Sequence, residues 1–184
     1  MKRLLIQFLL TALSANLAIG QELMIKFDKL TANNMANNPF TGDWSCEISS
    51  PGDIGSCKIP LKKDLPDTMR LKGNIDFEGS SVAEFDVTIC EALENEEFAN
   101  DILSHGIPKG QFPTQCPAIA GMDFEISKYK FPKEKLPPGG VPDGDFSGEI
   151  HMFEPSKDPY GTVRFEGKVF HELPELPKHP GLGR

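Results

Sequence analysis

The sequence predicts an all-β protein, a sandwich of two antiparallel sheets that carries one short helix. The first observation is a repeated alternation of apolar and polar residues, which is typical of strands buried on one face only. The second is the presence of 17 Gly and 16 Pro among 184 residues, which supplies many turns and disfavours a helical bundle. The third is that helical spacing of apolar residues is confined to one stretch, residues 91–105. Together these features predict a single domain of about six to eight strands, joined mostly as a meander.

The strands are expected where the side chains alternate in type. In residues 68–77, Met69 and Leu71 point to one face and Arg70 and Lys72 to the other. The same pattern recurs in residues 23–27, 83–89, 122–131, 146–152 and 163–169. We expect each of these segments to be half-buried, with its apolar face toward the opposite sheet.

Turn-forming residues separate the strands. Residues 78–81 read EGSS and predict a hairpin loop, and residues 155–161 read PSKDPYG and predict another. Residues 137–140 read PPGG, which predicts a wide turn. In the segment 122–131 the alternation slips before Tyr129, and this slip predicts a β-bulge.

The one helix is expected to follow Cys90. Its sequence, EALENEEFANDILSH, combines an apolar face with an acidic face, and Gly106 is expected to end it. A proline-rich loop then leads to Cys116. The apolar residues of the helix and the loop are Phe98, Ile102, Leu103, Ile107 and Phe112.

Residues 1–20 have the form of a secretory signal peptide. A short basic start precedes the apolar run LLIQFLL, and Ala18-Ile19-Gly20 has the small-x-small pattern that signal peptidase cleaves. A membrane anchor is the alternative, and it is disfavoured because polar residues interrupt a run that is already short for a span. We therefore expect a secreted, extracellular domain over residues 21–172, followed by a proline-rich, disordered tail over residues 173–184.

The four cysteines are expected to form two disulfides, because the secretory route is oxidising. Four cysteines allow three pairings, and we favour the two local closures, Cys46–Cys57 and Cys90–Cys116. Loop entropy predicts that these contribute about 3 and about 3.5 kcal/mol. A zinc site is the alternative, but no pair of cysteines has CxxC spacing. We expect no metal.

Charge and motifs exclude several classes of function. The 27 acidic and 19 basic residues give a net charge of −8, which argues against nucleic-acid binding and against adhesion to an anionic membrane. The sequence contains no G-x-S-x-G, no H-E-x-x-H, no P-loop and no dinucleotide fingerprint. We therefore expect a non-enzyme with no catalytic residues and no cofactor. A pair of carboxylates that acts on glycosides remains the enzymatic alternative.

Phenylalanine is unusually frequent among the aromatic residues, with 13 Phe beside 2 Tyr and 1 Trp. Phe has no polar group, so it belongs in a core or in an apolar cavity. Closely packed sheets would turn these rings into a filled core, whereas splayed sheets would form a cup with an apolar lining, and periodicity does not distinguish the two. The candidates for a cavity lining are Phe85, Val87, Phe124, Ile126, Phe146, Ile150, Phe165 and Val169.

The stretch from Cys90 to Ile150 resembles the ganglioside-activator branch of the ML lipid-recognition superfamily, and also the divergent insect secreted proteins related to it, chemosensory ones included. The resemblance rests on a series of short motifs in a fixed order. These are Ile89-Cys90-Glu91-Ala92-Leu93, Cys116-Pro117, Gly121 before an alternating strand, Leu136-Pro137, and Gly144-Asp145-Phe146. Four cysteines are fewer than ganglioside activators carry, and Phe146 stands where tyrosine is usual, so the similarity is greater to the divergent insect group.

The resemblance implies a β-cup that binds a lipid without catalysis and a disulfide between Cys90 and Cys116. It further implies that a mobile apolar rim meets a membrane surface and that the lipid is presented to a receptor or a lipid-processing enzyme. In this chain the rim would be formed by Phe98, Ile102, Leu103, Ile107 and Phe112.

Three hypotheses follow. The first is a secreted carrier of a lipid or another hydrophobic small ligand, with a cavity of about 300–1,000 Å³. The second is a secreted protein-interaction module with a filled core and an exposed apolar patch at the rim. The third is a hydrolase with two carboxyl groups of raised pKa in one cleft. We expect the first.

Overall fold

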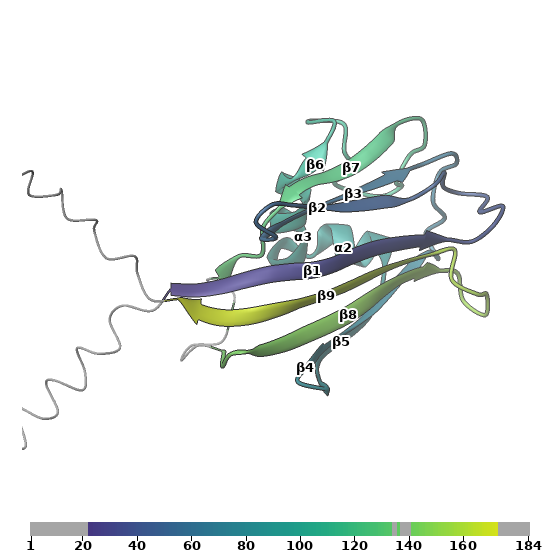
Figure 1. Ribbon diagram of the computed structural model, residues 1–184. Coiled ribbons are helices and arrows are strands. Elements are labelled where there is room, and N and C mark those ends of the chain that lie inside the picture. The colour runs from purple at the N-terminus through teal and green to yellow at the C-terminus, as the bar shows by residue number, and fades with distance from the viewer. Residues whose placement is uncertain (1–21, 134–135, 137–140, 173–184) are drawn as a thin grey trace, which may run out of the picture.

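The computed structural model describes residues 22–133, 136 and 141–172, and the predicted signal peptide and tail lie outside these residues. The chain forms two antiparallel sheets, which confirms the predicted all-β sandwich (Figure 1). The larger sheet has the order β1 (Glu22–Asn34), β9 (Gly161–Glu172), β8 (Gly144–Phe153), β4 (Arg70–Phe77) and β5 (Ser80–Thr88). The smaller sheet has the order β2 (Ser45–Ser49), β3 (Ile54–Pro60), β7 (Asp123–Tyr129) and β6 (Gly106–Ile107).

The predicted single helix is divided into two, α2 (Ile89–Glu94) and α3 (Glu96–Ser104). The division falls at Asn95, whose backbone is extended, with φ −76° and ψ 98°. The hydroxyl of Thr88 accepts a hydrogen bond from the Glu91 N–H, and the Glu91 carboxylate accepts one from the Thr88 N–H. This capping box fixes the start of α2 directly after β5. None of the described helices is long and apolar enough to cross a membrane.

The β-bulge predicted before Tyr129 is confirmed. The pairing of β3 with β7 shifts register between Gly55 and Cys57, opposite Ile126 and Tyr129. Lys128 occupies the left-handed region with φ 55°, which accommodates the additional residue of β7. A second bulge lies in β1, between Phe27 and Lys29, and the pairing with β9 continues beyond it to Asn34.

Both predicted disulfides are present, Cys46–Cys57 and Cys90–Cys116. The first joins directly paired residues of β2 and β3. The second joins α2 to the proline-rich loop before β7. Two structural disulfides indicate that the protein folds in an oxidising environment.

The buried core lies at one end of the sandwich. It consists of Leu61, Leu65, Met69, Ala118, Phe124, Met152 and Tyr160. Most of these residues belong to connections between strands, where β1 and β8 end and β4 and β9 begin. A buried Asn38 side chain braces this end, because its amide donates to Thr41 Oγ1 at 2.6 Å and to the Tyr160 carbonyl at 3.0 Å.

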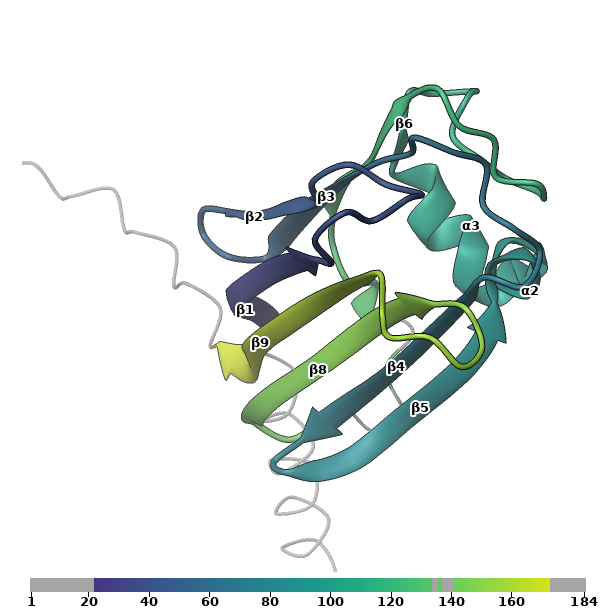
Figure 2. The same ribbon diagram turned by 90° about the vertical axis from the view of Figure 1, so that its right-hand side faces the viewer.

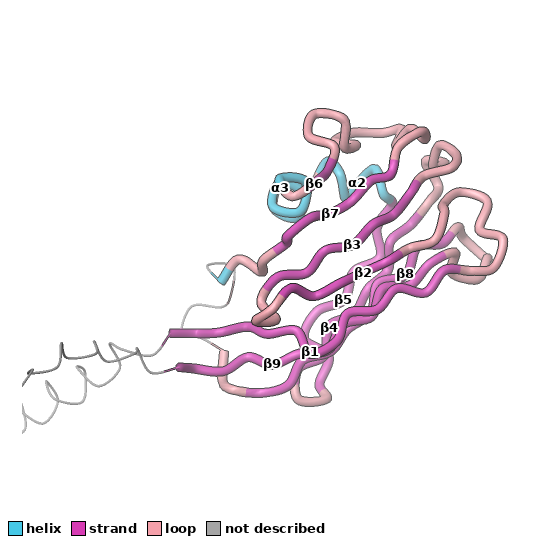
Figure 3. Tube along the Cα trace, turned by 45° about the horizontal axis from the view of Figure 1, so that its top comes forward, coloured by secondary structure: helices cyan, strands magenta, loops and turns pink. Residues whose placement is uncertain are grey.

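The backbones of the two sheets approach each other along one side. β1 contacts both β2 and β3, while α2 contacts β4 and β5 and α3 contacts β7. Figure 2 shows the helices on the side opposite β1. Figure 3 shows that β1 begins and β9 ends at the same end of the molecule. This end lies away from the buried core, since the core adjoins the last residue of β1 and the first of β9.

Candidate functional site

The face of the five-stranded sheet that looks toward the smaller sheet is apolar. Its orientation follows from Leu30, because a Cβ built on Gly55 of β3 would lie 3.1 Å from Leu30 Cδ2. Register places the residues of this face in rows across the strands. Each row is given in the strand order β1, β9, β8, β4 and β5, beginning at the end next to the core. The first two rows are Asn34, Gly161, Met152, Leu71 and Val87, and then Ala32, Val163, Ile150, Gly73 and Phe85. The next rows are Leu30, Phe165, Gly148, Ile75 and Ala83, then Phe27, Gly167, Phe146, Phe77 and Ser80, and last Ile25, Val169 and Gly144. We call the apolar residues of these rows the inner face.

Aromatic rings lie close over the glycines of the inner face. A Cβ on Gly73 would lie 2.5 Å from the Phe85 ring, and one on Gly167 would lie 2.5 Å from the Phe146 ring. A side chain at Gly73 would therefore displace the Phe85 ring, whereas glycine at position 167 is also required by the close backbone carbonyl of Lys26. The further pairs of ring and glycine are Phe165 with Gly148, Phe77 with Gly144, and Trp44 with Gly161.

Most of the inner face is partly accessible to solvent. Met152 and Val169 are buried, at 3% and 6% exposure, whereas the other apolar side chains in the rows are partly exposed and Ala83 is exposed. A filled sandwich of this size would bury most of these side chains. The inner face therefore offers apolar surface that a ligand can cover.

Six of the eight predicted lining residues lie together on the inner face. They are Phe85, Val87, Phe146, Ile150, Phe165 and Val169. The other two belong to β7 in the opposite sheet. Phe124 is 6% exposed and packs in the core against Phe112, with ring centroids 5.5 Å apart. Ile126 is partly buried and pairs with Gly106 and Cys57.

The predicted rim residues differ from one another in exposure and in location. Ile102 and Leu103 of α3 are partly buried, and Ile107 of β6 is 39% exposed. The Phe112 ring lies against both Phe124 and Gly106, so it belongs with the core. The Phe98 side chain lies outside the described part of the chain.

Two side-chain contacts with Tyr129 attach α3 and the following residue, His105, to β7. The Tyr129 hydroxyl donates to Asp101 Oδ2 at 3.1 Å, and the His105 ring packs edge-on against the Tyr129 ring at 5.5 Å. Burial of the phenol, together with the Asp101 charge, raises the pKa of Tyr129 above its ordinary value. The phenol therefore stays protonated and acts as a hydrogen-bond donor.

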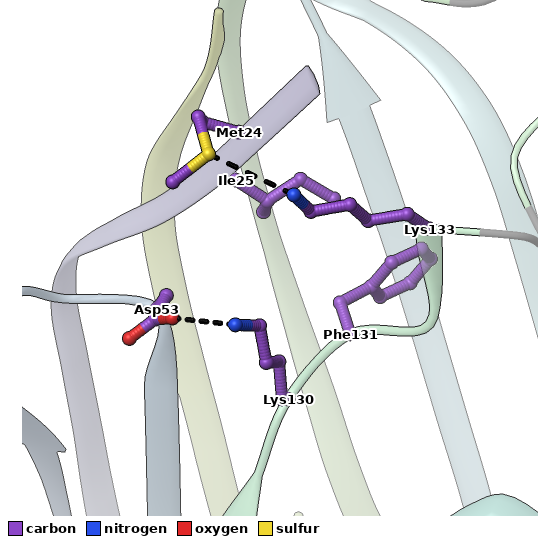
Figure 4. A pocket seen from close by; sticks show the side chains of 6 residues that line it. All are labelled: Met24, Ile25, Asp53, Lys130, Phe131 and Lys133. Carbon is purple, nitrogen blue, oxygen red and sulfur yellow. Dashed lines mark hydrogen bonds and ion pairs between the residues drawn. The ribbon is translucent and has the colours of Figure 1, made fainter. Parts of the chain in front are cut away.

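A small, solvent-open hollow with a free volume of about 10 Å³ lies at the end away from the core (Figure 4). It is lined by Met24, Ile25, Asp53, Lys130, Phe131 and Lys133. Three separate segments supply these side chains: the start of β1, the turn between β2 and β3, and the residues after β7. Sequence reasoning missed this hollow, because the residues share no local pattern and meet only through the sheet order.

The charges of the hollow are arranged as two ion pairs. Lys130 Nζ lies 2.8 Å from Asp53 Oδ2, and Lys133 Nζ lies 2.9 Å from Glu22 Oε1 and 3.7 Å from Met24 Sδ. The hydrogen bond from Lys130 lowers the pKa of Asp53, and the hydrogen bond from Lys133 lowers the pKa of Glu22. Both carboxyl groups are therefore ionised at neutral pH.

The described carboxyl groups with displaced pKa values are all shifted downward by hydrogen bonds or ion pairs. They are Glu22, Asp53, Glu91, Glu149 and Glu154. A general acid for glycoside hydrolysis needs a raised pKa instead. Within the described residues, a group of three potential metal ligands is formed by Asp67, Cys90 and Cys116. Both sulfurs are joined in the disulfide, so this group does not provide thiolate ligands.

No protein-family model matches the chain, and no curated protein matches it significantly.

Proposed function

We propose that the protein is a secreted, non-catalytic carrier that binds a lipid or another hydrophobic small ligand against the inner face. The observation that supports this proposal is the partial exposure of most of the inner face, in contrast to the buried core that adjoins one end of it. Removing apolar surface from water contributes about 25 cal/mol per Å², so an acyl chain laid along Phe27, Phe146 and Phe165 would supply the binding free energy.

The rings that lie over glycines favour this proposal over a filled core. A ring that lies over the glycine of a neighbouring strand covers apolar surface on both strands. The covered pairs run along the sheet from Gly73 to Gly144. The inner face therefore offers a row of apolar residues along which an elongated ligand can make contact.

The size of the hollow limits how the ligand lies. At about 10 Å³ it has room for about one water molecule, far below the range of about 300–1,000 Å³ expected for the pocket of a drug-sized ligand. We therefore propose that only one end of the ligand meets the hollow and that the rest of the ligand lies on the inner face. Ile25 belongs to both and would connect them.

The motif order between Cys90 and Ile150 supports the proposal as well. The Cys90–Cys116 disulfide implied by the resemblance to the ML superfamily is formed. We propose that the chain is a divergent member of this superfamily. Presentation of the ligand to a membrane surface, a receptor or a lipid-processing enzyme is part of the same proposal.

A pair of variants tests the proposal by moving one carboxylate between faces. Ala83 is exposed and lies on the inner face of the edge strand β5, and Glu84 follows it. The double variant Ala83→Glu/Glu84→Ala keeps the composition but places the charge on the inner face. After a soak in mixed lipids, we expect this variant to retain less lipid than the wild type, and Glu84→Ala alone to retain as much. Equal retention in all three proteins would contradict binding at the inner face.

A protein-interaction module is the second candidate. Ile119 is 60% exposed in the loop after Cys116, and Ile107 is 39% exposed on the edge strand β6. Exposed apolar side chains of this kind mark contact surfaces when they are contiguous. If no lipid is retained by the wild type, substitution of Ile107 and Ile119 by serine tests this candidate, with loss of a partner's binding as the expected result.

A further inference from the structure

We infer that the hollow is a subsite for an anionic headgroup, so that the preferred ligand is a single-chain amphiphile with a carboxylate at one end. This inference rests on the proposed function, because the chain of the amphiphile would occupy the inner face. It adds the chemical class of the ligand and the residue that selects it, Lys133.

The two lysines of the hollow differ in how their charge is compensated. Asp53, the partner of Lys130, is 14% exposed and ionised. Lys130 therefore neutralises a carboxylate that has little access to water, and its charge is not available to a ligand. Glu22, the partner of Lys133, is 72% exposed. An ion pair with so exposed a carboxylate contributes little, so a ligand carboxylate can replace Glu22 readily.

The position of Lys133 also fits a headgroup site. Its side chain is only 30% exposed and lies between Met24 and Phe131 at the edge of β1, beside Ile25 of the inner face (Figure 4). Ile25 lines the same hollow and pairs with Val169, and the next residue of its face, Phe27, packs edge-on against Phe146 at 5.6 Å. A ligand with its carboxylate at Lys133 would thus run over Ile25 and Phe27 toward the interior.

The overall charge of −8 sets a further condition on the ligand. The field of an acidic protein repels small anions, so Lys133 alone is not expected to concentrate acetate or phosphate from solution. The apolar chain must supply most of the affinity, and the cation must supply the preference for an acid over a neutral molecule of the same length.

The test compares laurate with lauryl alcohol, which share one chain and differ in the charge of the headgroup. Both compete for the full chain against a neutral fluorescent probe, N-phenylnaphthylamine, at a pH where laurate is ionised. We expect laurate to bind about tenfold more tightly than the alcohol. This is the gain expected when the Lys133 ammonium donates a hydrogen bond to the laurate carboxylate and solvent partly screens the two charges. Sodium acetate is expected not to compete.

Three variants locate the source of this preference. Lys133→Gln is expected to reduce the ratio of the two affinities to about one and to leave the affinity for the alcohol unchanged. Glu22→Gln removes the competing carboxylate and is expected to raise the ratio. Lys26→Gln is the control, because Lys26 lies on the same strand as Ile25 but over the Phe170 ring on the outer face.

The outcomes separate the two proposals. If both ligands bind equally well to the wild type, or if Lys133→Gln keeps the full ratio, the headgroup subsite is wrong while the carrier function stands. If neither ligand displaces the probe and the probe itself does not bind, the proposed function fails and the inference fails with it.

Discussion

The ring of Phe85 lies over Gly73, the residue directly paired with it on the neighbouring strand. A Cβ at position 73 would meet two ring atoms, at 2.5 and 2.6 Å, and no real Cβ tolerates such contacts. Gly73→Ala must therefore lift the ring from the sheet. We expect this substitution to destabilise the protein by about 1–3 kcal/mol, as overpacking does, measured by urea unfolding.

The cause of that loss can be isolated with a second substitution. Phe85→Leu shortens the side chain that blocks the new methyl group, so the double variant Gly73→Ala/Phe85→Leu is expected to lose less stability than the sum of the single variants. Strict additivity of the two losses would show that the ring does not lie on Gly73.

Substitutions in the core and on the inner face should differ in cost. Met69 is fully buried at 0% exposure, so Met69→Ala is expected to cost about 2–5 kcal/mol. Ile75 lies on the inner face and is partly exposed, so Ile75→Ala is expected to cost about 1 kcal/mol. Denaturant unfolding measures both, and equal losses would mean that the inner face is packed like the core.

The stability of the protein should fall in acid. The backbone N–H and hydroxyl of Thr88 lower the pKa of Glu91 below its ordinary value of 4.5, and Asp53 and Glu22 are shifted in the same direction by lysines. The unfolded chain therefore binds more protons than the folded chain near these pKa values. The stabilisation is fully present above about pH 5 and is lost as the pH falls through the folded pKa values.

Glu91→Gln checks the contribution of one of these groups. Glutamine accepts the same hydrogen bonds in a capping box but does not titrate in this range. We expect the variant to lose less stability than the wild type between about pH 5 and pH 3, measured as the shift of the thermal midpoint. The same acid slope in both proteins would contradict the role given to Glu91.

The Cys90–Cys116 disulfide closes the segment that contains both helices, with 26 residues of separation. In the loop-entropy description its removal costs about 3.5 kcal/mol. Cys90→Ser/Cys116→Ser should therefore unfold at a lower denaturant concentration than the wild type. A difference of less than about 1 kcal/mol would mean that the segment stays ordered in the unfolded chain.

The sequence predicted the strand faces, the bulge and the disulfides, because these features depend on residues that are close in the sequence. Alternation along residues 68–77 and 83–89 placed Leu71, Ile75 and Val87 on one face, and the structure pairs Leu71 with Val87. The slip of phase before Tyr129 marked a true bulge. Pairing each cysteine with its neighbour in the sequence predicted both disulfides, because residues near in sequence stay near each other in a small sandwich.

The features that the sequence did not predict depend on contacts between residues that are far apart in the chain. Periodicity gives the face of Phe85 but not the direction of its ring, which is decided by a glycine on the next strand. The helical pattern of residues 91–105 does not show that the backbone leaves the helix at Asn95. Likewise, Asp53 and Lys130 are 77 residues apart and meet only because β3 pairs with β7.

The central claim is that the inner face carries a hydrophobic ligand, and native mass spectrometry tests it most directly. The protein should be secreted from eukaryotic cells, measured intact, and measured again after a soak in mixed lipids. The carrier function predicts a stoichiometric adduct of lipid mass that organic extraction removes and that the soak restores. A bare protein mass both before and after the soak would contradict it.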